Sequence, residues 1–215
     1  MDVAVAGADL PIVDAFSLPA PHREALKPAE RVRADGGRVY ERPRYFYEVE
    51  SWAVALGTSL TAHFGLWEFM DVDVREAALM RTYPRYIPCA VAALATALEV
   101  LRLNVGVPVR IAANGGYRSP IHGGNRAASP HSWAAAANIH RIGAESLDSE
   151  ERIERYGTLA RRLLPSVWVR PYGTDAGTAN DHLHLDLGYV TVVPNTTSNR
   201  HHDAFVDGDA RQTDT

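Results

Sequence analysis

The sequence predicts an α+β fold around a single hydrophobic core, on three observations. Its 215 residues are 46% hydrophobic, which suits one domain with a substantial core. Two segments carry apolar residues at the three-and-four spacing of amphipathic helices. Shorter segments beside them alternate apolar with polar residues, as half-buried strands do.

The first helix is predicted over residues 88–103. Pro88 suits its first turn, and Val105-Gly106 ends it. Its apolar face consists of Val91, Leu94, Leu98 and Leu101. Residues 107–112 then alternate and predict a strand, which places Tyr117 and Arg118 just beyond its end.

The second helix is predicted to follow Asp148, which forms a capping box with Glu151. Pro165 ends this helix. Its apolar face consists of Ile153, Tyr156, Ala160, Leu163 and Leu164. Residues 167–170 and 183–193 are then predicted to be strands.

Alternation within these strands brings polar side chains together. In a strand every second side chain faces the same way, so His182, His184 and Asp186 share one face and the leucines between them face the core. Asn138 and His140 share a face in the same way if their segment is a strand. The polar faces therefore predict a common site.

The chain divides into three parts. Residues 1–50 are rich in proline and charge and predict a partly irregular N-terminal extension with one strand. Residues 51–194 form the predicted domain. Residues 195–215 are polar and predict a flexible tail.

Composition narrows the classes of partner. The formal net charge of −4 leaves no basic footprint, so we expect no nucleic-acid or membrane partner and favour a small peptide or amino-acid-derived substrate. The first twenty residues do not resemble a secretion signal, and no apolar run could span a bilayer, so we expect a cytoplasmic protein. The single cysteine, Cys89, is expected to be a buried structural thiol.

The candidate site combines imidazoles, a carboxylate and an arginine. Zinc favours imidazole and carboxylate ligands, and a catalytic zinc site keeps one position open. His131, the Asn138/His140 pair and His184 could supply the ligands. Asp181 is the candidate general base, and Arg118 the candidate group for a substrate carboxylate or carbonyl. Taken singly, each of these side chains is more often structural or solvent-exposed, and only their order along the chain favours a site.

At this point the chain resembles the zinc D-Ala-D-Ala carboxypeptidase and dipeptidase family, whose domain is shared with hedgehog-like metallopeptidases. The resemblance covers about residues 66–193 and rests on Gly116-Tyr117-Arg118-Ser119, Ser129-Pro130-His131 and Asp181-His182-Leu183-His184. It implies a small antiparallel sheet flanked by helices. It also implies zinc ligands at His131, at position 138 and at His184, a catalytic base at Asp181, and substrate contacts from Arg118, Ser129 and Tyr117.

The sequence departs from this family at two positions. The family has a ligand aspartate where this chain has Asn138, and a small residue, commonly glycine, where it has Ala134. A neutral amide is a poorer ligand for a divalent transition metal than a carboxylate. His140 offers a substitute, because a site of His131, His140 and His184 suits zinc and also suits iron or copper.

Three functions therefore stay open. The first is a metal-dependent hydrolase that cleaves a small peptide with metal-activated water, as the family does. The second is a biosynthetic metalloenzyme, with iron or copper and redox chemistry, that reuses the fold. The third is a non-catalytic binding protein that has lost the metal.

Overall fold

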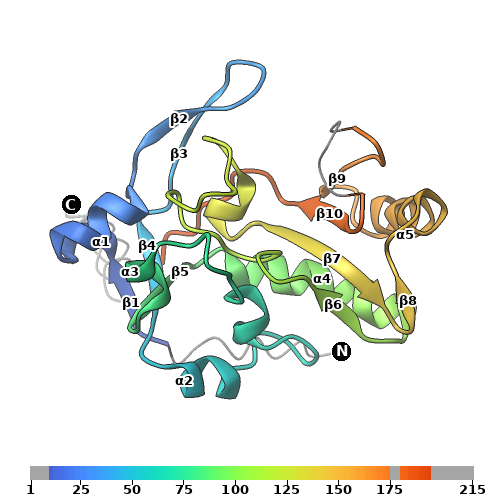
Figure 1. The fold of residues 1–215 in the computed structure, drawn as a ribbon, viewed down its shortest axis with the longest axis horizontal. Coiled ribbons are helices and arrows are strands. Elements are labelled where there is room, and N and C mark those ends of the chain that lie inside the picture. Colours follow the sequence, from blue (N-terminus) through green and yellow to red (C-terminus); the bar gives the residue numbers. More distant parts are fainter. Residues whose placement is uncertain (1–9, 175–179, 195–215) are drawn as a thin grey trace, which may run out of the picture.

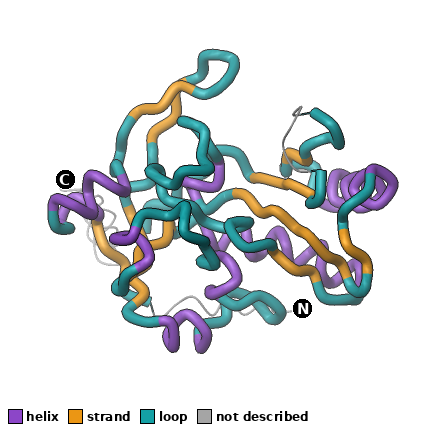
Figure 2. Tube along the Cα trace, in the orientation of Figure 1, coloured by secondary structure: helices purple, strands orange, loops and turns teal. Residues whose placement is uncertain are grey.

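The computed structural model describes residues 10–174 and 180–194, which form the predicted α+β fold with small antiparallel sheets (Figure 1; Figure 2). The α-helices are α1 (Ala20–Leu26), α2 (Trp52–Gly57), α3 (Ala78–Arg81), α4 (Val91–Val105) and α5 (Glu150–Leu163), and the 3-10 helices are η1 (Ala15–Ser17), η2 (Leu66–Phe69) and η3 (Pro130–Trp133). The strands are β1 (Ile12–Asp14), β2 (Arg31–Arg33), β3 (Val39–Glu41), β4 (Tyr45–Val49), β5 (Arg85–Pro88), β6 (Val109–Ile111), β7 (Ala136–Ile142), β8 (Glu145–Ser146), β9 (Trp168–Val169) and β10 (Leu183–Asp186).

The central sheet has the strand order β6-β7-β10-β9, and β8 pairs with β7. Its strands pair antiparallel, and the register sets His184 opposite Asn138. Ile139 and Leu183 face one side, where they pack in the main core with Leu94 of α4. Asn138 and His184 therefore face the other side of the sheet, away from this core.

Both predicted long helices are present, but with different boundaries. α4 begins at Val91, because Pro88 is the last residue of β5, so the predicted place of Pro88 in the first helical turn is wrong. α4 ends at Val105, as predicted, and its C-cap Gly106 has a φ of +69°, the left-handed conformation that glycine adopts readily. The capping box at Asp148 is wrong: Ser149 is the N-cap of α5, and Asp148 instead accepts a hydrogen bond from Arg152 at 2.8 Å. A side-chain ion pair thus replaces the predicted backbone cap.

The last predicted strand, 183–193, is too long. β10 ends at Asp186, because the Oδ1 atom of that residue accepts a hydrogen bond from the backbone N–H of Gly188 at 2.7 Å. Gly188 has a φ of +75°, which turns the chain out of the extended conformation. Alternation alone could not reveal this turn.

Residues 10–50 contain more regular structure than the single predicted strand. β1 and β5 flank β4 in an antiparallel sheet, so the N-terminal segment pairs with a strand of the predicted domain. Val49 belongs to the main core. β2 and β3 form a hairpin that projects from the body of the molecule (Figure 1).

Two further expectations concern burial and the ends of the chain. Cys89 is buried, and burial raises the pKa of its thiol to about 12, as a structural role requires. Within residues 10–174 and 180–194, no helix has both the length and the apolar composition to cross a bilayer. The predicted tail, 195–215, lies outside the described residues.

Candidate metal centre and substrate cavity

A cavity of about 770 Å³ lies over the polar face of the central sheet, within the size range of small-molecule sites. It brings together residues from β7, β9, β10, η3 and the loop after β6. The predicted site residues that line it are Arg118, Ser129, His131, Asn138, Asp181 and His184. Segments far apart in the sequence therefore converge on one volume.

Two glycines shape the turn that leads to Arg118. A Cβ atom on Gly115 would lie 2.6 Å from the carbonyl oxygen of Ala112, and one on Gly116 would lie 2.5 Å from that of Phe69. Both contacts are closer than any side chain tolerates, so only glycine fits. The close approach lets the carbonyl of Gly116 face His131.

His131 lies in η3, directly after Ser129 and Pro130. It is buried, and its Nδ1 atom donates to the carbonyl oxygen of Gly116 at 2.8 Å. A carbonyl can only accept, so Nδ1 carries the proton and Nε2 keeps its lone pair. Ala134 ends this 3-10 helix at a φ of +53°, a conformation that explains why glycine also suits the position.

His184 is held from the other side of the cavity, on β10. Its Nε2 atom lies 3.1 Å from Oδ2 of Asp186. The carboxylate accepts, so Nε2 carries the proton and Nδ1 keeps its lone pair. The ring centroids of His131 and His184 are 5.2 Å apart, which brings two imidazoles with defined tautomers together in one cavity.

The environment of both histidines favours the neutral form of the ring. Burial lowers the pKa of His131 well below its usual value, and the positive charge of Arg118 adds to the effect. Burial also lowers the pKa of His184, although Asp186 opposes the shift. Neutral imidazoles with one N–H held by a protein acceptor are the usual arrangement of histidine metal ligands.

Asn138 faces the free nitrogen of His184. Its Oδ1 atom lies 2.8 Å from Nδ1 of that residue, across the β7–β10 register. An amide oxygen and an imidazole lone pair repel each other at this distance unless a proton or a metal cation lies between them. The neutral alternative turns the amide so that its NH₂ group donates to Nδ1.

Arg118 enters the cavity from a rigid turn. The next residue, Ser119, is fully buried and donates to Glu76 through both its backbone N–H, at 2.9 Å, and its hydroxyl, at 2.6 Å. The guanidinium of Arg118 has no hydrogen-bond or ion-pair partner among residues 10–174 and 180–194, and its Nε atom is buried. Burial lowers the pKa of Arg118 to about 10.

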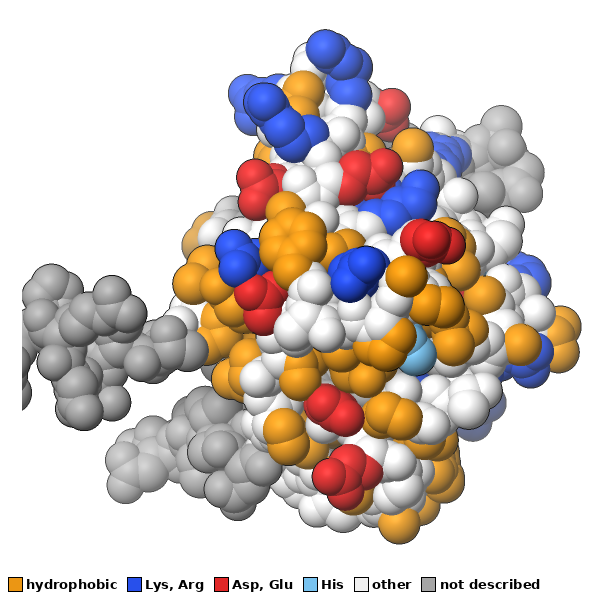
Figure 3. Space-filling model, turned by 90° about the vertical axis from the view of Figure 1, so that its left-hand side faces the viewer, with side chains coloured by type: hydrophobic (Ala, Val, Ile, Leu, Met, Phe, Trp, Pro, Cys, Tyr) orange, Lys and Arg blue, Asp and Glu red, His pale blue; other side chains and the backbone are white. Residues whose placement is uncertain are grey.

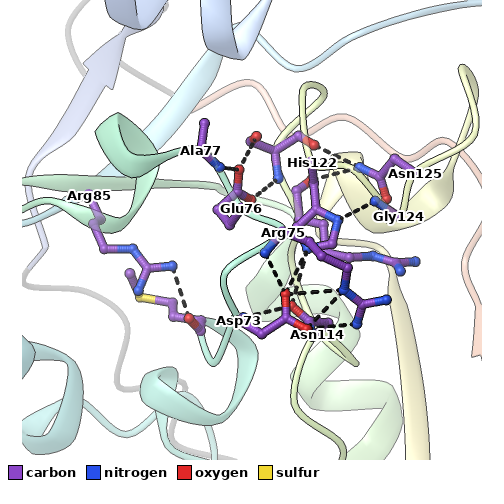
Figure 4. Close-up of polar contacts among 12 residues, drawn as sticks. Asp73, Arg75, Glu76, Ala77, Arg85, Asn114, His122, Gly124 and Asn125 are labelled. Carbon is purple, nitrogen blue, oxygen red and sulfur yellow. Dashed lines mark hydrogen bonds and ion pairs between the residues drawn. The ribbon is translucent and has the colours of Figure 1, made fainter.

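A polar network holds the loop around Arg118 (Figure 4). Asn114 accepts from the backbone N–H of Asp73 at 2.9 Å and contacts Nε2 of the buried His122 at 3.2 Å. Asn125 donates to the carbonyl of Ser119 at 2.7 Å and to the hydroxyl of Ser132 at 2.9 Å. Ser132 follows His131, so these hydrogen bonds connect the turn that carries Arg118 to η3, the 3-10 helix that carries His131.

Asp181, which also lines the cavity, is linked by hydrogen bonds to His182 and, through it, to Arg170. Arg170 donates to Nε2 of His182 at 2.7 Å, so this nitrogen is unprotonated. Nδ1 of His182 therefore donates to Oδ1 of Asp181 at 2.8 Å. Asp181 itself is mostly exposed, and the hydrogen bond from the partly buried His182 orients its carboxylate.

Two predicted site residues do not line the cavity. Tyr117 is buried in the main core, where burial raises the pKa of its hydroxyl, so the expected substrate contact is replaced by a packing role. His140 lies on β7 as predicted, but it is not one of the cavity-lining residues, so it is not brought together with His131 and His184. His182 and Asp186 do line the cavity, although they were predicted only to share its face.

Trp168 is a site residue that the sequence did not reveal. It lines the cavity, remains half exposed, and packs edge-on against His184 with ring centroids 5.7 Å apart. It occurs in a two-residue strand, too short for any periodic signal.

Among the described residues, no group of three or more histidine, cysteine, aspartate or glutamate side chains is arranged to hold a metal ion. The cavity instead holds the imidazoles of His131 and His184 and the amide of Asn138. Imidazole nitrogens are common ligands of divalent transition metals, and an amide oxygen is a weaker one than a carboxylate. Searches among protein-family models, curated proteins and solved structures found no match to the chain.

Proposed function

We propose that the protein is a metal-dependent hydrolase of small peptides, with a site resembling that of the D-Ala-D-Ala carboxypeptidase and hedgehog-like family and with zinc as its metal. One observation carries the proposal. His131 and His184 each hold one ring N–H on a protein acceptor, and both line the same cavity, where Asn138 contacts the other ring nitrogen of His184 at 2.8 Å.

The metal would be held by Nε2 of His131, Nδ1 of His184 and Oδ1 of Asn138. When bound, such an ion supplies Lewis-acid catalysis, by polarising a carbonyl and by lowering the pKa of water. Asp186 and the carbonyl of Gly116 orient the two imidazoles and maintain their tautomers.

The remaining residues act on the substrate and the proton. Arg118 binds a carboxylate or a developing negative charge, since it lines the cavity and its guanidinium, whose Nε atom is buried, lacks a partner among the described residues. Asp181 accepts a proton from the attacking water and returns it to the leaving amine. His182 positions Asp181 through the 2.8 Å hydrogen bond and is itself oriented by Arg170.

The test measures zinc content and peptidase activity on the same preparations. Wild type is expected to bind about one zinc per chain and to hydrolyse D-Ala-D-Ala or a related dipeptide. His131→Ala and His184→Ala are expected to lose both, whereas His140→Ala, the matched control outside the cavity, keeps both. Zinc binding with no hydrolysis of any small peptide would overturn the enzymatic proposal, and equal loss in His140→Ala would overturn the assigned ligands.

A further inference from the structure

Two aromatic residues, Trp168 and Tyr189, line the cavity, and the proposed chemistry uses neither of them. Exposure alone would not distinguish them, because folded proteins expose many apolar side chains. Figure 3 shows such hydrophobic side chains spread over one face of this molecule. What distinguishes the two rings is that the fold holds both of them at the wall of the candidate site.

The central sheet fixes the place of Trp168. β9 pairs with β10 so that Trp168 lies opposite Asp186, and the backbone N–H of Arg170 donates to the carbonyl of His184 at 3.0 Å. Val169, between the two, is buried in the main core. Because side chains alternate along a strand, Trp168 projects from the face that carries His184 and Asp186.

The indole packs against His184 and leaves much of its own surface open. The two ring planes are inclined at 68°, with centroids 5.7 Å apart, so the contact is edge-on and covers only part of the indole. Trp168 keeps 52% of its surface exposed. The indole therefore offers apolar surface to a group that enters the cavity beside His184.

Tyr189 offers a ligand its ring rather than its hydroxyl. The hydroxyl donates to the carbonyl of Ala128 at 3.0 Å, so it is already bonded. The ring stacks on Tyr40 of the β2–β3 hairpin, with centroids 4.0 Å apart, and packs edge-on against Trp133 at 5.0 Å. Ala128 lines the cavity as well, so the wall beside this ring is apolar.

Both rings lie near the carboxylate of Asp186. Trp168 is opposite this residue, and Tyr189 follows it by three positions, after the turn at Gly188. The carboxylate is engaged within the protein, since Oδ2 lies 3.1 Å from Nε2 of His184 and Oδ1 accepts from the N–H of Gly188 at 2.7 Å. Asp186 therefore does not require a cationic ligand beside the rings.

The other charges of the cavity favour a neutral ring over a cation. An aromatic face binds a cation as well as another ring. Within the described part of the chain, the charged lining residues are Arg75, Arg118, Arg126 and Arg170, with Asp35, Asp181 and Asp186. Burial and then the charges of Arg75 and Arg170 lower the pKa of Arg118, so these arginines are close enough to disfavour a further cation.

We propose that Trp168 and Tyr189 form a subsite for an aromatic side chain of a peptide, which binds beside His184. The inference rests on the proposed function in taking a peptide as the ligand, and it narrows the substrate class to peptides with an aromatic residue. It concerns binding, so its test needs neither metal nor hydrolysis.

The experiment measures dipeptide binding to the metal-free full chain by calorimetry. The probes are Ala-Ala, Phe-Ala and Ala-Phe, with Leu-Ala and Ala-Leu as apolar counterparts. Wild type is expected to bind at least one phenylalanine dipeptide about tenfold more tightly than Ala-Ala, because its ring buries apolar surface and packs on the indole. The leucine counterpart is expected to lie between them. Trp168→Ala is expected to abolish the preference, and Trp168→Phe to keep part of it.

Matched variants separate the subsite from general effects. Trp52→Ala removes an indole that is 41% exposed on α2 and is not a cavity-lining residue, so it is expected to leave the preference unchanged. Tyr189→Phe keeps the ring and is expected to keep the preference, whereas Tyr189→Leu reduces it. In wild type, the indole N–H resonance of Trp168, assigned by its absence from Trp168→Phe, is expected to shift when the phenylalanine dipeptide binds.

A role of Trp168 confined to packing against His184 gives a different result, because Trp168→Ala would then weaken binding of Ala-Ala and of the phenylalanine dipeptides equally. That outcome overturns the subsite. A leucine dipeptide that binds as tightly as its phenylalanine counterpart, or an indole resonance that no dipeptide shifts, overturns it as well. Hydrolysis by zinc-loaded protein is measured separately, so its absence would contradict the proposed function and leave the binding preference standing.

Discussion

Position 138 illustrates how one atom alters a site at the residue scale. Asn138 occupies the place opposite His184 in the β7–β10 register, 2.8 Å from the nitrogen that would bind metal. Replacing its amide with a carboxylate would change no backbone contact, because its backbone N–H and carbonyl bond to Gly115 and Ala112. The consequence of the amide is therefore electrostatic.

Asn138→Asp is expected to tighten zinc binding by at least about tenfold, because an anionic carboxylate is the better ligand and offsets the charge of the ion. The dissociation constant is measured by competition with a chelating dye at pH 7.5. Asn104→Asp is the matched control, since Asn104 is an exposed amide on α4. Unchanged affinity in Asn138→Asp would exclude position 138 from the metal site.

At the scale of elements, the turn after β6 connects separate parts of the candidate site. Gly116 approaches the backbone of Phe69, and its carbonyl accepts from His131. Tyr117 then donates its backbone N–H to the carbonyl of Phe69 at 2.7 Å. One turn thus joins the η2 segment, the arginine and the first histidine.

Gly116→Ala is expected to lower the free energy of unfolding by about 1–3 kcal/mol, because the added Cβ would lie 2.5 Å from the carbonyl oxygen of Phe69. Gly57→Ala is the matched control. Gly57 has no atom within 4 Å of an added Cβ, so this change is expected to be neutral or stabilising by up to about 1 kcal/mol. Urea denaturation measures both, and equal stabilities would show that the turn can yield.

At the scale of the whole molecule, burial acts on most of the described histidines in the same direction. It is the main reason why the pKa values of His122, His131, His140, His182 and His184 are all lowered. Above the usual histidine pKa of about 6.5, folded and unfolded chains are both neutral at these positions. Below it, the unfolded chain binds protons that the folded chain does not.

The stability of the metal-free protein is therefore expected to fall as the pH is lowered from 7 to 5. Each histidine that protonates only in the unfolded chain contributes at most about 1.4 kcal/mol per pH unit. The free energy of unfolding is measured by denaturant titration at each pH, in the presence of a chelator. Stability that stays constant or rises towards pH 5 would contradict the lowered pKa values.

The spacing of apolar residues along the sequence was sufficient to predict the helices and strands that have a clear period. α4 and α5 follow from apolar spacing, and the pairing of His184 with Asp186 follows from alternation along one strand. The N-terminal segment was underestimated, because β1, β2 and β3 are three residues each. β1 is stabilised by pairing with the more distant β4, and β2 and β3 are stabilised by pairing with each other. Such strands carry too few residues for a period to appear.

The sequence by itself determined the α+β class, the two long helices and the set of residues from which a metal site could be built. Only the tertiary structure decided which of them meet: His131, Asn138 and His184 share a cavity, whereas His140 and Tyr117 do not line it. It also brought Trp168 and Tyr189 to the same cavity. The physical reason is that spacing along the chain sets which face a side chain occupies, while strand register and packing set what that face meets.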